Sequence, residues 1–181
     1  MTGTDFLATL WFFVPAYVAN IVPVLVRGRL EWLAGPMDGG RTWRGRRVLG
    51  DHKTWRGLVT GTLAGTVAFA LQRALYAHGV LGALALFDYE TLGLLPGVLL
   101  AAGALLGDAA KSFVKRQLDI APGASWVGPD QLDFLAGAYL CVSVIVAPPL
   151  VATIAIAPVV FVGALLTTAT GYGLGLKPSW I

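Results

Sequence analysis

Long uncharged runs alternate with short charged segments along this chain of 181 residues. A membrane-spanning helix needs about 20 mostly apolar residues, because the hydrocarbon core of a bilayer is roughly 30 Å thick. The pattern predicts five such helices, at residues 6–26, 57–78, 91–110, 132–152 and 155–176. The last two share an uncharged run, 134–176, that is too long for one helix, so we expect a turn near Pro148-Pro149 or Pro158. The sequence therefore predicts an all-α integral membrane protein that forms a single polytopic domain over residues 1–181.

Composition supports a membrane protein and excludes several other classes. Only 13% of the residues are charged, whereas a soluble domain has about 25%. This scarcity excludes an ordinary cytosolic enzyme, a disordered tail and a nucleic-acid-binding domain. The single cysteine, Cys141, excludes a disulfide framework and a cysteine-based zinc site.

The basic residues lie almost entirely on one side of the predicted membrane. With five spans, the loops 27–56 and 111–131 share that side with the C-terminus, and together with the adjoining helix ends they carry twelve of the thirteen basic residues. These are Arg27, Arg29, Arg41, Arg44, Arg46, Arg47, Lys53, Arg56, Lys111, Lys115, Arg116 and Lys177. Because basic loops stay in the cytoplasm, we expect a multi-pass protein of the cell membrane whose N-terminus is outside and whose C-terminus is cytoplasmic.

Glycines recur every four residues in two of the predicted spans, 57–78 and 91–110, which is the spacing of close helix packing in lipid. They are Gly57, Gly61 and Gly65, then Gly93 and Gly97, then Gly103 and Gly107. We assign these stripes to helix packing. Asn20 is a polar residue in the first span, between Pro15 and Pro23; either it hydrogen-bonds to another helix or it lines a cavity.

The second loop and its flanking helix ends carry three aspartates beside several basic residues. If the third helix continues past residue 107, four polar residues fall on one face at positions i, i+3, i+4 and i+7, namely Asp108, Lys111, Ser112 and Lys115. Asp130 and Asp133 share a face at the start of the fourth span. Carboxylates suit Mg²⁺, which is typically held by one or two of them plus substrate phosphates. The alternative is structural: Asp108 pairs with Lys111, and Asp130 caps the fourth helix.

The first loop is rich in both glycine and arginine. Glycines let the backbone fold around an anion, and arginines bind phosphate through two nitrogens. The Lys53-Thr54 pair is typical of the end of a phosphate-binding P-loop, but the remaining pattern of that motif is absent. The loop is therefore interpreted either as a nucleotide-binding element or as a contact with anionic lipids.

Several motifs together resemble one family of membrane enzymes. The second segment, with Ser112, Lys115-Arg116, Leu118-Asp119, Pro122-Gly123 and Asp130-Gln131-Leu132-Asp133, resembles the signature of the integral-membrane CTP:phosphatidate cytidylyltransferases. Gln131 stands where the bacterial signature has arginine. The whole chain more closely resembles the archaeal branch, the CDP-archaeol synthases, through Pro15-Ala16-Tyr17-Val18-Ala19-Asn20, Arg47-x-Leu49-Gly50-Asp51-x-Lys53-Thr54-Trp55-Arg56-Gly57 and Gly107-Asp108-x-x-Lys111-Ser112.

The resemblance implies transfer of a cytidylyl group from CTP to 2,3-bis-O-geranylgeranylglycerol 1-phosphate, with release of pyrophosphate. We expect Mg²⁺ as the cofactor, held by Asp108, Asp130 and Asp133. The expected catalytic residues are Lys53, Lys111, Lys115 and Arg116, and the expected nucleotide-binding residues are Asn20, Arg46, Arg47, Lys53, Thr54 and Ser112. The expected partners are CTP, the ether-lipid phosphate, membrane lipids and a second copy in a homodimer, but no nucleic acid.

Two other functions compete with this interpretation. A CDP-alcohol phosphotransferase needs Asp-Gly-x-x-Ala-Arg followed by two more aspartates, and Asp38-Gly39-Gly40-Arg41 does not continue in that way. A small transporter needs polar or charged residues near the middle of the membrane, and the predicted spans hold little beyond Asn20, Gln72 and Arg73.

Overall fold

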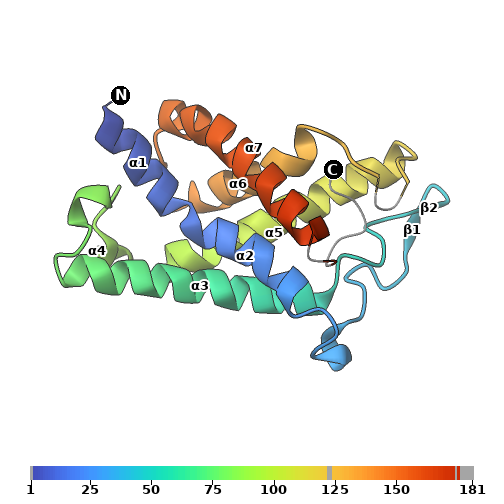
Figure 1. Ribbon diagram of the computed structural model, residues 1–181. Helices are drawn as coiled ribbons and strands as arrows, with labels where there is room; N and C mark the ends of the chain where they lie inside the picture. Colours follow the sequence, from blue (N-terminus) through green and yellow to red (C-terminus); the bar gives the residue numbers. More distant parts are fainter. Residues whose placement is uncertain (1, 122–123, 174, 176–181) are drawn as a thin grey trace.

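The computed structural model describes residues 2–121, 124–173 and 175, and the regular secondary structure of these residues is helical apart from one small hairpin. The helices are α1 (Gly3–Phe12), α2 (Val14–Leu25), α3 (Trp55–Ala77), α4 (Tyr89–Leu92), α5 (Leu95–Gln117), α6 (Pro129–Val142) and α7 (Leu150–Gly173) (Figure 1). Single 3-10 turns cover Glu31–Leu33 and Gly82–Leu84. The hairpin pairs β1 (Thr42–Trp43) with β2 (Arg46–Arg47) in antiparallel register. Lys177 and the Pro122-Gly123 pair of the signature lie outside the described residues.

Four helical segments are long and apolar enough to cross a membrane within the described part of the chain. They are Gly3–Leu25, Trp55–Ala77, Leu95–Gln117 and Leu150–Gly173. Helix α6 has 14 residues, so at 1.5 Å per residue it extends about 21 Å, less than the thickness of a hydrocarbon core. The chain is thus a helical, multi-pass membrane protein, with a shorter helix among the long ones.

Two boundaries differ from those expected from the sequence. Helix α5 continues through Gln117, so residues 111–117 are helical rather than part of the loop 111–131. The turn between the last two predicted spans covers residues 143–149 and so lies at Pro148-Pro149, one of the two expected places, whereas α6 ends at Val142 rather than at residue 152. Consecutive prolines, Pro148-Pro149, explain its position because they cannot donate helical hydrogen bonds. Pro158, by contrast, is accommodated inside α7.

The first apolar run is divided into two helices at Phe13, which ends α1 and caps α2. Pro15 follows in the first turn of α2, where its missing N–H leaves no helical hydrogen bond unmade. Buried aromatic rings hold this junction, with Phe12 against Phe69 of α3 and Phe69 against Tyr89 at centroid separations of 6.5 and 5.2 Å.

Glycines bring the central helices into close contact. A Cβ on Gly61 of α3 would lie 2.5 Å from the carbonyl oxygen of Ala19 in α2, and one on Gly107 of α5 would collide with the carbonyl oxygen of Asp133 in α6. Gly137 of α6 packs equally tightly on Gly103 and Gly107. The expected packing role is confirmed for Gly61, Gly65, Gly97, Gly103 and Gly107 but is wrong for Gly93, which ends α4 with a positive φ and has no atom near its Cβ position. The α5–α6 contact brings Asp108 and Asp133 close together.

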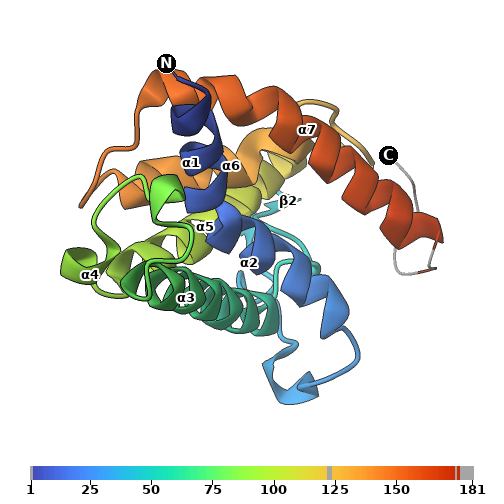
Figure 2. The ribbon, with the colours of Figure 1, turned by 60° about the vertical axis from the view of Figure 1, so that its left-hand side comes forward.

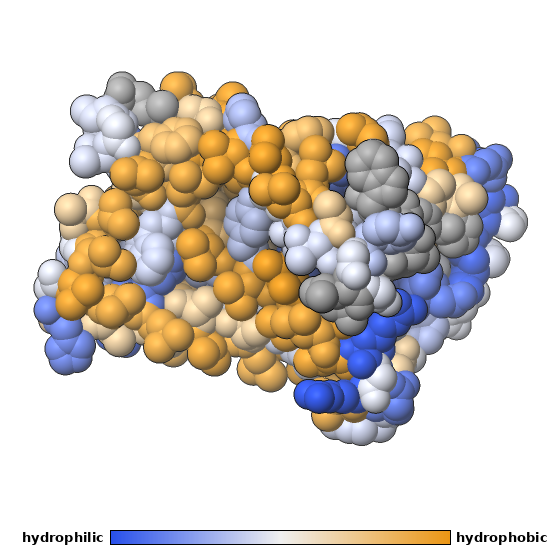
Figure 3. Space-filling view, viewed as in Figure 1, coloured by the Kyte–Doolittle hydropathy of each residue, from blue (hydrophilic) through white to orange (hydrophobic). Residues whose placement is uncertain are grey.

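The polar residues gather at one end of the helical bundle. In Figure 3 apolar side chains cover most of the face in view, and the largest group of hydrophilic ones lies at the end that carries the hairpin. Strand β2 lies against α5 there, so loop 27–54 is folded onto the ends of the helices. Helix α7 packs against α1 and α6, and its last turns stand away from the other helices (Figure 2).

Candidate active site

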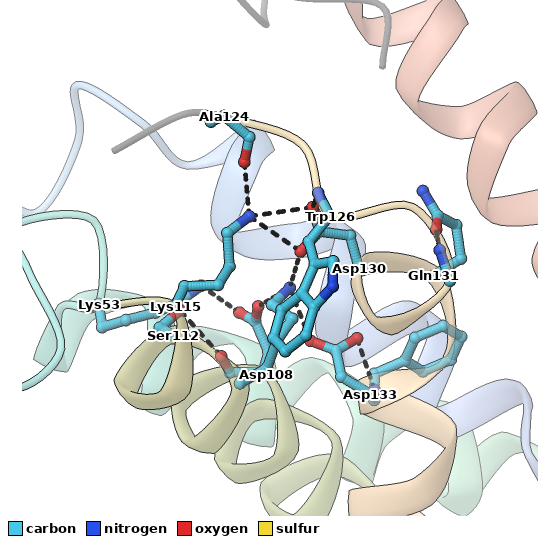
Figure 4. A network of polar contacts seen from close by, with 12 residues as sticks. Lys53, Asp108, Ser112, Lys115, Ala124, Trp126, Asp130, Gln131 and Asp133 are labelled. Carbon is cyan, nitrogen blue, oxygen red and sulfur yellow. Dashed lines mark hydrogen bonds and ion pairs between the residues drawn. The ribbon is translucent and has the colours of Figure 1, made fainter. Parts of the chain in front are cut away.

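The last turns of α5 and the first turn of α6 form one charged cluster (Figure 4). The predicted face of α5 exists, since α5 remains helical through residues 108–115. Ser112 donates its hydroxyl hydrogen to the Asp108 carbonyl oxygen at 2.9 Å, so this hydroxyl is used within the helix. The cluster lies just beyond the Gly107 contact, and the close approach of the two helices is what assembles it.

Lys111 stands at the centre of three carboxylates. Its ammonium nitrogen lies 3.0 Å from Asp108 Oδ1, 3.0 Å from Asp130 Oδ1 and 2.8 Å from Asp133 Oδ2. The Lys111 side chain is only 13% exposed, so water screens these ion pairs poorly. The local pairing of Asp108 with Lys111 is therefore present, and the same ammonium also binds the two aspartates of α6.

Two more lysines complete the cluster from different directions. Lys115 Nζ lies 3.0 Å from Asp130 Oδ2 and donates to the Ala124 carbonyl oxygen at 2.6 Å. Lys53 comes from the first loop, 55 residues earlier in the chain, and forms an ion pair with Asp108 Oδ2. Three ammonium groups thus meet three carboxylates, and the formal charges cancel.

Asp130 and Asp133 are held differently by the backbone. Asp130 accepts a hydrogen bond from Trp126 N at 2.6 Å; α6 begins at Pro129 after Gly128, so Asp130 lies inside the first turn and is not the N-cap. Asp133 Oδ1 accepts from Phe134 N at 2.8 Å. Its other oxygen, Oδ2, is buried, and its one partner among the described residues is the Lys111 ammonium at 2.8 Å.

Asp38, which the sequence reasoning did not select, organises the first loop. Its side chain is 2% exposed and accepts hydrogen bonds from Gly40 N at 3.0 Å, Leu49 N at 2.9 Å and Gly50 N at 3.1 Å. Arg47 Nη2 donates to the same carboxylate at 3.1 Å. Burial opposes ionisation, but these hydrogen bonds outweigh it and hold the pKa of Asp38 well below its ordinary range. The Asp-Gly-Gly sequence, typical of a turn, was the available signal for this anchor.

The remaining predicted residues of the first loop have structural partners as well. Arg47 bridges Asp38 and Asp51, with Asp51 Oδ1 at 2.8 Å, and these pairs raise the pKa of the Arg47 guanidinium. Arg46 reaches across to the end of α5, where it binds Asp119 and the Gln117 carbonyl oxygen.

Thr54 caps α3 by accepting a hydrogen bond from Gly57 N at 3.1 Å. Thr54 therefore starts the helix that follows the loop, in addition to its predicted role in binding the nucleotide. Lys53 precedes this cap directly, so the helix start also fixes where Lys53 leaves the loop.

Two further predicted site residues, Arg116 and Asn20, and the signature residue Gln131 also lie outside the ion-pair cluster. Arg116 follows Lys115 on α5, forms no ion pair among the described residues, and its Nε is buried without a partner there. Asn20 is half-buried in α2 and makes no side-chain hydrogen bond within the described part of the chain. Gln131, at the position of the bacterial arginine, accepts from Gly128 N at 2.7 Å and so caps the start of α6.

Comparisons with known proteins point to one family of membrane enzymes. Residues 4–181 match the family model described as CarS-like, CDP-archaeol synthase. A CDP-archaeol synthase of Halorubrum lacusprofundi is 41% identical over 98% of both chains, and one of Thermococcus onnurineus is 44% identical over 76% of this chain and 75% of its own. A solved structure of an intramembrane enzyme for archaeal membrane lipids biosynthesis matches with a TM-score of 0.68 and 34% identity, covering 87% of this chain and 90% of its own.

Proposed function

This chain belongs to the CarS-like family of CDP-archaeol synthases and is accordingly a CTP-dependent cytidylyltransferase that acts on a lipid phosphate; we propose that its lipid substrate is 2,3-bis-O-geranylgeranylglycerol 1-phosphate and that it requires Mg²⁺. The observation that carries the proposal is the convergence of three carboxylates and three ammonium groups at the polar end of the bundle. The match to a cytidylyltransferase family favours this function over a phosphotransferase or a transporter.

The proposed reaction needs positioning and charge neutralisation more than proton transfer. An oxygen of the lipid phosphate forms a bond to the α-phosphorus of CTP, and the bond from that phosphorus to the bridging oxygen of the β-phosphate breaks. The products are the CDP-lipid and pyrophosphate. Because the attacking oxygen is already anionic, no strong general base is required, and catalysis rests on alignment and on stabilising negative charge.

The carboxylates fit a magnesium site. Carboxylate oxygens are the ligands Mg²⁺ prefers, and it commonly takes one or two of them together with substrate phosphates. Asp108, Asp130 and Asp133 already converge on one cation, the Lys111 ammonium, and the buried Asp133 Oδ2 has no other partner among the described residues. In that part of the chain no three such side chains form a ready-made metal site, as expected where substrate supplies the other ligands. Bound there, Mg²⁺ would neutralise the charge of the triphosphate.

The basic residues would hold the two phosphate-bearing substrates. Lys53, Lys111 and Lys115 present ammonium groups at one point. Arg116, on the same helix end, adds a guanidinium whose Nε has no hydrogen-bond partner among the described residues. For the nucleotide we propose Lys53, Arg46, Arg47, Thr54, Ser112 and Asn20. Arg46 pairs with the exposed Asp119, and exposed ion pairs exchange partners at little free-energy cost.

The proposed topology has five spans, with α6 and residues 143–149 together forming the fourth. Loop 27–54 and the α5–α6 connection carry the basic residues, and the positive-inside rule places both in the cytoplasm with the N-terminus outside. Cysteine labelling from either side of a sealed vesicle would test this orientation. A homodimer is also proposed, and native mass spectrometry of the solubilised protein would measure it.

The enzymatic proposal is tested with purified protein in detergent, CTP labelled at the α-phosphate, Mg²⁺ and the diether lipid phosphate. We expect labelled CDP-lipid and unlabelled pyrophosphate, with no product when EDTA removes divalent ions. Asp133→Asn should abolish product formation, whereas Asp88→Asn, at the N-cap of α4, should leave it unchanged. A folded protein that makes no CDP-lipid would refute the substrate assignment, and a fully active Asp133→Asn variant would refute the metal assignment.

A further inference from the structure

The first loop begins with a stretch, residues 27–33, that projects from the side of the bundle. This 27–33 stretch follows α2 and includes the 3-10 turn Glu31–Leu33. Figures 1 and 2 both show it standing away from α2 and α3, at the level where α3 begins. The hairpin of β1 and β2 lies farther along the bundle, beyond the start of α3 (Figure 1). The loop therefore has two parts, one beside the helix ends and one beyond them.

Two large apolar side chains of the 27–33 stretch are exposed. The exposure of Trp32 is 80% and that of Leu30 is 44%. Leu30 also has a left-handed backbone conformation, with φ of 52°, which residues other than glycine rarely adopt. Packing within the protein explains neither side chain, because the fold exposes both instead of burying them.

The 27–33 stretch is fastened to the first turn of α3 by one guanidinium group. Arg56 Nη1 donates to the Arg29 carbonyl oxygen at 2.8 Å and to Glu31 Oε1 at 2.9 Å. The Arg56 side chain is only 12% exposed, so its position is restricted by the surrounding chain. Trp32 is therefore presented from a turn that is held against α3.

The start of α3 is also where a lipid-facing stripe of that helix ends. Five exposed apolar residues recur at four-residue intervals along α3, namely Trp55, Val59, Leu63, Val67 and Leu71. Residues four apart lie on one helix face, and α3 is among the segments able to span a membrane. Tryptophan is enriched at the boundary between hydrocarbon and water, so Trp55 marks that boundary on α3. Because Arg56, the neighbour of Trp55, holds the 27–33 stretch, Trp32 lies near the same boundary.

Two arginines of the 27–33 stretch have no acidic partner. Arg27 and Arg29 are exposed, and neither guanidinium forms an ion pair within the part of the chain that the structure describes. The arginines of β2 differ, since Arg46 pairs with Asp119 and Arg47 with two aspartates of its own loop. Basic residues beside a membrane helix attract anionic lipid headgroups. The stretch thus combines apolar side chains with unpaired positive charge at the height of the headgroups.

We infer that the 27–33 stretch is an interfacial anchor, in which Trp32 and Leu30 insert among the headgroups and Arg27 and Arg29 bind the phosphates of anionic bilayer lipids. The partner is the surface of the surrounding bilayer and neither substrate, so the inference does not depend on the proposed lipid substrate. The anchor fixes the height of the α3 start above the membrane, and Lys53 leaves the loop just before that start. The loop therefore divides its work, with residues 27–33 on the bilayer and the later residues at the charged cluster.

Fluorescence quenching in nanodiscs tests the insertion of Trp32. The full chain is reconstituted in lipid that carries bromine near the headgroup end of its acyl chains, where bromine quenches tryptophans at that depth. We expect Trp32→Phe to remove a quenched component from the emission of the wild-type protein. Trp43→Phe is the matched control, because Trp43 is 55% exposed on β1 of the same loop; it should remove an unquenched component. Equal quenching of the two components, whether strong or weak, would overturn the inference.

The arginines are tested by the choice of lipid headgroup. Brominated phosphatidylglycerol, diluted in unlabelled phosphatidylcholine, should quench the Trp32 component more than brominated phosphatidylcholine at the same mole fraction. Combining Arg27→Gln with Arg29→Gln should lower this preference about fivefold for each arginine, the equivalent of about 1 kcal/mol near an anionic surface. The control combines Arg41→Gln with Arg44→Gln, both exposed in the hairpin part of the loop, and should keep the preference. A preference that survives the loss of Arg27 and Arg29, or that the control loses equally, would overturn the inference.

Discussion

Replacement of Lys111 by methionine removes one positive charge from the middle of three carboxylates and keeps a side chain of similar length. The Lys111 ammonium lies 2.8 Å from Asp133 Oδ2 and 3.0 Å from an oxygen of each of the other two aspartates. Asp133 is 7% exposed, so its charge would stay buried without a counter-ion. Removing one partner of a buried ion pair costs about 3–5 kcal/mol. Asp108 and Asp130 are about one-fifth exposed. Because water can partly solvate these two carboxylates, we expect a loss of stability at the lower end of this range.

The same substitution should make stability depend on magnesium. Three carboxylates without Lys111 form a stronger cation site, and a ligand present at 100 times its Kd stabilises the folded state by about 2.7 kcal/mol. For a chain of this size each kcal/mol shifts Tm by about 2–4 °C. We expect Lys111→Met to lower Tm by roughly 6–12 °C in EDTA and to recover most of that loss in Mg²⁺, while catalytic activity stays lost.

Thermal unfolding of the detergent-solubilised protein, with and without Mg²⁺, measures both effects. Arg116→Met is the matched control, because Arg116 lies on the same helix end and forms no ion pair among the described residues; it should change Tm little and leave the magnesium response as in the wild type. A Lys111→Met protein as stable as the wild type in EDTA, or one that Mg²⁺ does not stabilise, would show that the three carboxylates do not share this cation.

Three further substitutions test how the site is positioned. Because hydrogen bonds hold the pKa of Asp38 below its ordinary value, the ionised carboxylate stabilises the first loop above that value, and the stabilisation is lost as the pH falls through the lowered pKa; Asp38→Asn should therefore accelerate amide hydrogen exchange in residues 40–50 at neutral pH. Gly107→Ala should separate α5 from Asp133 and lower both Tm and kcat, whereas Gly82→Ala, where a Cβ meets open space, should change neither. Thr54→Ala removes the cap of α3 and should reduce the free energy of unfolding by about 1 kcal/mol, measured by chemical denaturation.

The helices and part of the site follow from local patterns in the sequence. Uncharged runs predict the long apolar helices because a lipid-embedded segment must satisfy its own backbone hydrogen bonds. Likewise, the spacing of Asp108, Lys111 and Lys115 fixes a common helix face once α5 continues past Gly107. The family resemblance, carried by these same motifs, is confirmed by the match over residues 4–181.

The contacts between distant segments were not predictable in the same way. Nothing in the spacing of Lys53 indicates that it pairs with Asp108, 55 residues away, because that contact depends on how the first loop folds over the helix ends. Asp38 sets this fold by accepting hydrogen bonds from backbone N–H groups. A sequence pattern does not show which backbone groups a side chain will bind. The glycine spacing likewise predicted a close helix contact without identifying α6 as the partner of Gly107.

The balance of charge in the cluster explains why a divalent cation belongs to the proposed reaction. A buried charge without a partner is strongly unfavourable, so three ammonium groups can be kept at the end of an apolar bundle only if three carboxylates neutralise them. Each lysine is then already paired, and a phosphate that attracts Lys53 or Lys111 leaves an aspartate uncompensated. A cation that binds those carboxylates as the phosphates arrive restores the balance. In the proposed reaction, Mg²⁺ held by these aspartates would leave the lysines free to bind the triphosphate and the lipid phosphate.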